Sequence, residues 1–131
     1  MRLLLDTCTF LWFAERPENL SPKVRRALQD PEATLYLSAA SMWEILVKHM
    51  TGKYMSLHVP QAPERYFVEL RARLDVTPLP VTEEAVAQLP TLPPIHRDPF
   101  DRLLVCQAIA HGLTLVTPDD QITAYPVATL W

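Results

Sequence analysis

The sequence predicts an α/β fold in which helices pack against a largely parallel sheet. Short apolar runs that suit buried strands alternate along the chain with longer segments whose apolar residues recur at helical spacing. The length of 131 residues suits a single domain, residues 1–131, with a hydrophobic core of its own. The 13 prolines fall mostly between the periodic segments, where loops and helix starts are expected.

The predicted elements follow one another in a regular order. Apolar runs of strand length are expected at residues 2–6, 34–38, 76–81, 113–117 and 127–130. Helices are expected at residues 7–16, 21–30, 39–52, 60–74, 82–89 and 99–112, with a helical turn at 118–122. Because helices separate most of the strands, neighbouring strands are expected to run parallel.

Local signals justify several of these elements. Ser21 is expected to cap the second helix, with Pro22 at the first helical position. Gly52 is expected to end the helix that starts at residue 39. Pro78 weakens the strand over 76–81, because proline cannot donate a hydrogen bond to a neighbouring strand.

The composition excludes several classes of protein. The net charge of −3 argues against binding nucleic acid through an overall basic surface. A phosphate-bearing substrate would therefore need local positive charge, which a divalent cation can supply. With only 2 glycines, Gly52 and Gly112, the chain lacks both the glycine-rich phosphate loop and the dinucleotide-binding fingerprint.

The cysteines and the N-terminal residues indicate a compartment. Cys8 and Cys106 stand in apolar contexts and suit neither a disulfide framework nor a zinc site. Residues 1–18 are hydrophobic but interrupted by Asp6, which makes them too short and too charged for a signal peptide or a membrane span. We therefore expect a protein of the reducing cytoplasm without a membrane partner.

Asp6 and Glu44 each have a structural and a functional interpretation. Asp6 ends the first strand, where it can cap the following helix or bind a metal at the edge of the sheet. Glu44 follows Ser41 at the spacing of a capping box and precedes Lys48 at the spacing of a helical ion pair. The position of Asp6 favours neither interpretation, whereas Glu44 taken alone is interpreted as structural.

The stretch HRDPFDRLLVCQA, residues 96–108, brings two acids to the start of an apolar helix. Asp98 suits the N-cap, with Pro99 at the first helical position. Asp101 falls in the first turn on an apolar stripe, and Gln107 is expected to mark the solvent-facing side of the helix instead. Because an unpaired buried charge is costly, Asp101 requires a cation.

A third group of polar residues follows the strand over 113–117. Thr117 is expected to cap the next turn, with Asp120 as the acid three residues further on. Asp119 has no capping role in this arrangement, so it is either a solvated turn residue or a ligand.

All of these acids fall at strand ends or in the first turn of a helix, along the edge of the sheet where α/β folds form their sites. Converging carboxylates repel one another and raise each other's pKa values, and a hard divalent cation removes this conflict. Carboxylate oxygens suit Mg²⁺ or Mn²⁺, and no histidine or cysteine has the spacing of a zinc ligand. The sequence therefore predicts a magnesium site, with manganese as an alternative ion.

The ordered motifs LLLDTCTFLW, SMWEILVK, HRDPFDRLLVCQA and LTLVTPDD resemble those of PIN-domain ribonucleases. The closest resemblance is to the VapC-like toxins of type II VapBC toxin–antitoxin modules, and it spans nearly the whole chain. The resemblance implies a three-layer α/β/α domain with a mostly parallel central sheet. It also implies Mg²⁺-dependent endonucleolytic cleavage of RNA, a cognate antitoxin protein as partner, and a homodimer.

The resemblance also carries over site residues. The catalytic and metal-binding acids correspond to Asp6, Glu44, Asp101 and Asp119. Residues that support these ligands correspond to Asp98, Thr117 and Asp120. Because Asp120 adds a carboxylate beside Asp119, either of the two can be the fourth acid. Candidates for holding the RNA backbone, or else members of a solvated charged face, are Lys48, His49, Lys53, Arg97 and Arg102.

Two other functions remain open at this point. One is a catalytically silent PIN domain that binds protein or RNA, against which the four intact acids argue. The other is a metal-dependent phosphatase or phosphotransferase with Asp6 as the nucleophile. The common pattern of such enzymes has a second aspartate two residues further on, where this chain has Cys8. The aromatic and Met residues of segment 42–55 are expected to pack in the core or to contact a partner.

Overall fold

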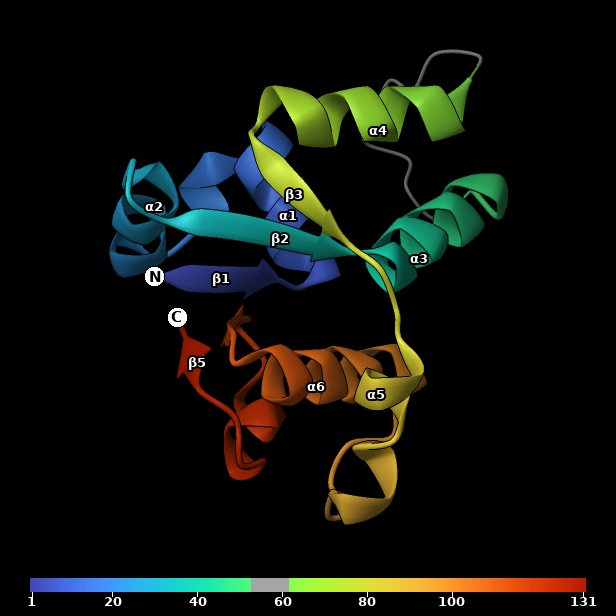
Figure 1. Cartoon of the computed structure of the whole chain (residues 1–131). Helices are drawn as coiled ribbons and strands as arrows, with labels where there is room; N and C mark the ends of the chain where they lie inside the picture. The colour runs from blue at the N-terminus through green and yellow to red at the C-terminus, as the bar shows by residue number, and fades with distance from the viewer. Residues whose placement is uncertain (53–61) are drawn as a thin grey trace.

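A computed structural model describes residues 1–52 and 62–131 and shows an α/β domain (Figure 1). Its strands are β1 (Arg2–Leu5), β2 (Thr34–Ser38), β3 (Val76–Leu79), β4 (Thr114–Val116) and β5 (Thr129–Leu130). Its α-helices are α1 (Thr7–Glu15), α2 (Pro22–Gln29), α3 (Ala39–Met50), α4 (Pro63–Arg73), α5 (Glu83–Val86) and α6 (Pro99–His111). Short 3₁₀ helices are η1 (Pro17–Asn19), η2 (Leu89–Thr91) and η3 (Asp120–Ala124).

The predicted elements are present, with shifts at their ends. The helix expected over 82–89 is the shorter α5, and the turn expected at 118–122 begins and ends two residues later as η3. Residues 60 and 61, expected to begin the fourth helix, lie outside the described residues. The 3₁₀ helices η1 and η2 were not expected, since each has proline at its start and no apolar periodicity.

The strands form one sheet in the order β3-β2-β1-β4-β5, and every neighbouring pair is parallel. From the central β1 the chain first adds β2 and β3 on one side, then adds β4 and β5 on the other. The direction of winding therefore reverses beside β1. In open α/β sheets the crevice for a ligand forms at this reversal, outside the carboxyl ends of the strands.

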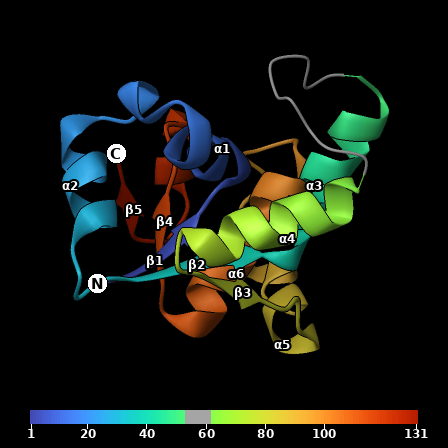
Figure 2. The ribbon, with the colours of Figure 1, turned by 90° about the horizontal axis from the view of Figure 1, so that it is seen from above.

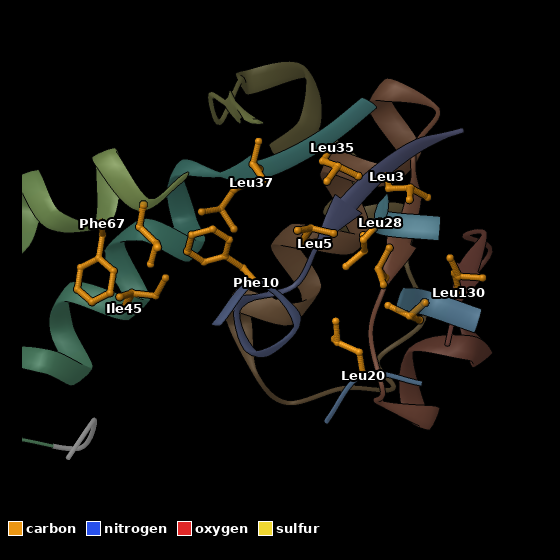
Figure 3. Close-up of a cluster of buried hydrophobic side chains, with 14 residues drawn as sticks. Leu3, Leu5, Phe10, Leu20, Leu28, Leu35, Leu37, Ile45, Phe67 and Leu130 are labelled. Carbon is orange, nitrogen blue, oxygen red and sulfur yellow. The ribbon is translucent and has the colours of Figure 1, made fainter. Parts of the chain in front are cut away.

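Helices cover both faces of the sheet, which gives the expected three layers. Figure 2 shows α1 and α2 on one side of the strands and α6 on the other. Alternate residues of β1 divide accordingly, because successive side chains of a strand point to opposite faces. Leu3 and Leu5 pack with residues of α1, α2, α3 and α4, including Phe10 and Phe67 (Figure 3), whereas Leu4 packs with residues of α6.

The residues at the two edges of the sheet fit their positions. Pro78 lies in β3, which is an edge strand, as expected for a strand that contains proline. At the opposite edge, β5 has 2 residues. No helix among residues 1–52 and 62–131 is both long and apolar enough to cross a membrane.

One expectation about α6 is wrong. Gln107 does not mark a solvent-facing side, because its side chain is fully buried and its Nε2 donates to the carbonyl of Pro80 at 3.2 Å. This hydrogen bond thus joins α6 to the segment that leads from β3 to α5. Both sides of α6 are covered near its middle, so a polar residue there faces protein and not water.

Candidate active site at the carboxyl edge of the sheet

The predicted acids come together in one cleft of about 250 Å³ at the carboxyl ends of β1 and β4. The lining residues are Asp6, Thr7, Cys8, Glu44, Lys48, Asp98, Asp101, Pro118 and Asp119. All four acids assigned by resemblance are among them, although they come from widely separated parts of the sequence. The cleft lies where the winding of the sheet reverses, as the fold class leads one to expect.

Asp6 combines the two roles that its sequence position left open. Its carboxylate accepts a hydrogen bond from the backbone N–H of Thr9 at 2.7 Å, so it caps α1. It also lines the cleft and is buried. Burial raises its pKa above the ordinary range, while hydrogen bonds from Thr9 and Thr117 act in the opposite direction.

Glu44 projects into the cleft from α3 and forms the expected ion pair with Lys48, at 3.1 Å. The capping box expected from Ser41 and Glu44 is wrong. The N-cap of α3 is Ser38, whose hydroxyl accepts from the backbone N–H of Ala40, and Ser41 is buried inside the helix. Because Glu44 therefore lies beyond the first turn, capping does not account for its position in the cleft.

The two acids of the HRDPFDR motif have different environments. Asp98 is the N-cap of α6, as predicted, and accepts from the backbone N–H of Phe100 at 2.8 Å. Asp101 lies in the first turn of α6, where burial raises its pKa to about 6. The negative charges of Asp98, Asp6 and Glu44 add to this increase, and His96 acts against it.

Asp119 and Asp120 are clearly separated by the fold. Asp119 lines the cleft and caps η3 by accepting from the backbone N–H of Gln121 at 2.9 Å. The capping role expected for Thr117 with Asp120 is therefore wrong, because Asp119 is itself the cap. Thr117 is buried, and its hydroxyl oxygen accepts from the backbone N–H of Asp119 at 3.1 Å. Asp120 is exposed and does not line the cleft.

His96 is a site residue that the sequence did not reveal. Its Nε2 lies 2.6 Å from a carboxylate oxygen of Asp119 and 3.3 Å from one of Asp101. The sequence spacing of zinc ligands, from which histidine was excluded, does not reveal this contact, because the fold joins His96 to acids on two other elements. The available signal was its place two residues before the cap Asp98, but a proline-rich loop gives no periodicity from which to predict its direction.

The basic residues expected to hold the RNA backbone are distributed unevenly around the cleft. Lys48 lines it, and Arg97 is exposed beside His96. Arg102 instead lines a second, apolar pocket between α5 and α6. His49 packs edge-on against the Phe67 ring, with 6.5 Å between the ring centroids. Lys53 lies outside the described residues.

The donor set fits a hard divalent cation. Carboxylate oxygens are the ligands preferred by Mg²⁺ and Mn²⁺, and the cleft offers them from several elements. The buried hydroxyl of Thr7 also lines the cleft and has no hydrogen-bond partner within the described parts of the chain. Metal-bound water would provide such a partner, and Mg²⁺ commonly keeps several of its waters.

Comparisons with known proteins bear on the family and on the fold. A family model for the PIN domain matches residues 3–127. Similar solved structures include VapBC2 from Rickettsia felis bound to a promoter DNA fragment, at 17% identity and a TM-score of 0.70 over 100% of this chain and 99% of that chain. VapBC-1 from nontypeable Haemophilus influenzae is 19% identical, with a TM-score of 0.64 over 99% of this chain and 97% of that chain. DNA-bound VapBC from Salmonella typhimurium is 17% identical, with a TM-score of 0.65 over the same two shares, 99% and 97%.

No curated protein sequence matches the chain. The similarity to the solved structures is a similarity of fold, since all of these identities are low. The match to the family model is of a different kind, because it spans nearly the whole sequence and includes every acid of the cleft. The chain belongs to the PIN domain family.

Proposed function

We propose that this protein is a Mg²⁺-dependent endoribonuclease, with Mn²⁺ as an alternative ion, and the toxin of a VapBC-type toxin–antitoxin module. The observation that carries the proposal is the convergence of Asp6, Glu44, Asp101 and Asp119 in one cleft. Four acids from four parts of the chain meet in this cleft, where burial and the charges of Asp98, Asp6 and Glu44 raise the pKa of Asp101 and so oppose its ionisation. Such an arrangement is costly for folding alone and useful for holding a cation.

The residues of the cleft suit phosphodiester hydrolysis. When bound, the metal ion supplies an activated water and stabilises negative charge on the attacked phosphate. Asp6, Glu44, Asp101 and Asp119 would hold the ion from the ends of β1 and β4, from α3 and from the first turn of α6. Thr117 would support them, since it contacts both Asp6 and Asp119. Asp98 fixes the start of α6 and thereby the direction of Asp101.

The substrate is proposed to be single-stranded or looped RNA, because unstacked bases are the usual targets of RNA recognition. Lys48 lies in the cleft and Arg97 on the adjoining loop, so these two residues would contact the phosphate backbone. Arg102 is a weaker candidate than the sequence indicated, because it lines a different pocket. Local positive charge of this kind agrees with a net charge of −3, which argues against an overall basic surface.

The proposed partners are a cognate antitoxin protein and a second copy of this chain, in the cytoplasm. The support is an apolar stripe on α3: Trp43, Val47 and Met50 are 64%, 42% and 82% exposed. These residues are spaced by four and three positions and so share one side of the helix. Ile45 is instead in the core, so the described apolar residues of segment 42–55 divide between core packing and an exposed face, and Tyr54 and Met55 lie outside the described residues.

The direct test is cleavage of a mixed RNA substrate by the purified protein. We expect cleavage with Mg²⁺ or Mn²⁺ and none with excess EDTA. The restoration of activity by added metal would exclude an effect of the chelator on folding. A protein that binds Mg²⁺ and RNA but cleaves no RNA would be a silent binding module. Hydrolysis of phosphate monoesters in place of RNA would support the phosphatase alternative.

A further inference from the structure

We propose that His96 is a positioning residue, which orients the Asp119 carboxylate by donating from Nε2 and does not itself bind the metal. The inference rests on the proposed metal-dependent function, because it assigns a role within the same site. It starts from the place of His96 between two acids that the sequence separates: Asp101 on α6 and Asp119 at the start of η3.

The His96 residue is held at three points. Its backbone N–H donates to the hydroxyl of the buried Tyr125 at 2.7 Å. Its ring nitrogen Nδ1 accepts from the backbone N–H of Asp98 at 3.0 Å. Its other ring nitrogen, Nε2, contacts the carboxylate of Asp119 at 2.6 Å. A side chain fixed at both ring nitrogens and at the backbone has one orientation, as a positioning residue requires.

The contact with Asp98 determines which ring nitrogen carries the proton. A backbone N–H is always a donor, so the Nδ1 that faces it must present a lone pair. In the neutral imidazole one nitrogen is protonated and the other is not, which assigns the proton to Nε2. The short distance to Asp119 agrees with an N–H that donates to a charged carboxylate.

A histidine beside acids can either bind a metal or donate a hydrogen bond to the acids, and the position of its proton decides between these two roles. A metal ligand needs a lone pair on Nε2, and moving the proton to Nδ1 would set two N–H groups against each other at Asp98. The donor role needs no such change. Each carboxylate keeps further lone pairs for a cation, since a carboxylate has about four acceptor sites. His96 therefore fixes the direction of the Asp119 carboxylate and leaves its other lone pairs to the ion.

The first test measures the tautomer directly. Nitrogen-15 NMR of the metal-free protein is expected to show His96 protonated at Nε2 and unprotonated at Nδ1. A proton found at Nδ1 would overturn the inference. With Mn²⁺ bound, pulsed EPR is expected to show no directly bonded ring nitrogen. A nitrogen coupling that disappears in the His96→Gln variant would overturn the inference by making His96 a ligand.

Two matched variants separate the contacts of the ring. The amide nitrogen of His96→Gln reaches the place of Nε2 and keeps a donor toward Asp119. The amide oxygen of His96→Asn reaches the place of Nδ1 and keeps the acceptor for Asp98, but this variant loses the donor. Mn²⁺ affinity measured by calorimetry is expected to fall about 10–100-fold in His96→Asn and to stay within about threefold of the parent in His96→Gln. His111→Gln, at the other end of α6, is the control and is expected to leave the affinity unchanged.

The outcomes separate this inference from the proposed function. If the parent binds Mn²⁺ and cleaves RNA while His96→Asn binds with parental affinity, the positioning role fails and the function stands. Equal losses in the Asn and Gln variants would also contradict the role, because only one of them lacks the donor. A parent protein that binds no divalent ion would instead contradict the proposed function, whatever the tautomer of His96.

Discussion

Two cavities of similar size lie beside the start of α6, and they differ completely in chemistry. The acidic cleft has a volume of about 250 Å³, and the pocket between α5 and α6 has a volume of about 260 Å³. The second is lined by Val86, Leu89, Pro99, Arg102, Leu103 and Cys106. Consecutive residues of a helix point about 100° apart, so Asp101 serves one cavity and Arg102 the other. Volume alone therefore does not identify the site.

The two cavities also differ in their effect on folding. The pocket between α5 and α6 has one charged side chain, Arg102, in a lining otherwise made of apolar residues. The acids of the cleft are partly buried next to one another, and burial raises the pKa of both Asp6 and Asp101. Ionisation of these acids therefore opposes folding, and a bound cation would offset this cost.

The largest effect is expected for Asp101→Asn. Loss of several kcal/mol of metal-based stabilisation corresponds to two or more decades of cleavage rate, at about 1.4 kcal/mol per decade. Rates measured under single-turnover conditions, with circular dichroism to verify the fold, provide the measurement. The control is Val86→Ala in the apolar pocket, where a rate within about twofold of the parent is expected because no contact with the substrate is lost. Equal losses of cleavage rate in Asp101→Asn and Val86→Ala would indicate that the two cavities belong to one site.

Added Mg²⁺ is expected to stabilise the folded protein. At about 10–100 times its dissociation constant, the ion should add roughly 1.4–2.7 kcal/mol to the free energy of unfolding. Thermal melts with and without Mg²⁺, at matched ionic strength, measure this increase. The double variant Asp6→Asn, Asp101→Asn should melt at a higher temperature than the parent in chelator, yet gain little from Mg²⁺. If monovalent salt alone reproduced the parental increase, screening would explain it without coordination.

The stability of the metal-free protein is expected to depend on pH through Asp101. A carboxyl group whose pKa is raised on folding binds its proton more tightly in the folded state. The stabilisation of the folded state by this tighter proton binding is complete below about pH 4. It is lost as the pH rises through the folded-state pKa of Asp101, which is about 6. In chelator, Asp101→Asn should therefore be more stable than the parent at pH 7.5, by on the order of 2 kcal/mol, with no difference near pH 4. If Asp101→Asn kept its full stability advantage over the parent at pH 4, the advantage would come from packing and not from charge.

The smallest effect is expected for Asp98→Ala. This variant removes the cap of α6, so it should lower the free energy of unfolding by about 1 kcal/mol in chemical denaturation. It should also lower the pKa of Asp101, because the charge of Asp98 helps to raise it. Cleavage is expected to fall by less than a decade. A loss as large as that of Asp101→Asn would mean that Asp98 acts on the substrate or the metal and not only on the helix.

Much of the fold and of the cleft follows from local sequence signals. Apolar runs and helical periodicity predicted the strands and helices because burial patterns depend on spacing alone. The same reasoning assigned Asp98 as a cap, since Pro99 limits where a helix can begin. The meeting of the acids was predictable because the carboxyl ends of parallel strands share one edge of the sheet.

The remaining features depend on contacts between distant residues. Ser38 and Ser41 both have acceptable capping chemistry, and only the end of β2 decides that Ser38 is the cap. His96 was missed because its partner Asp119 lies 23 residues further along the chain. Gln107 is buried because the carbonyl of Pro80 lies opposite it. In each case the deciding group belongs to another element, so no local pattern contains it.

The two edges of the sheet have a consequence for self-association. An incoming strand needs a row of unpaired backbone groups, yet β3 contains Pro78, which has no N–H to offer, and β5 has only 2 residues. Amyloid-like growth by the addition of strands is therefore disfavoured at both edges of the folded protein.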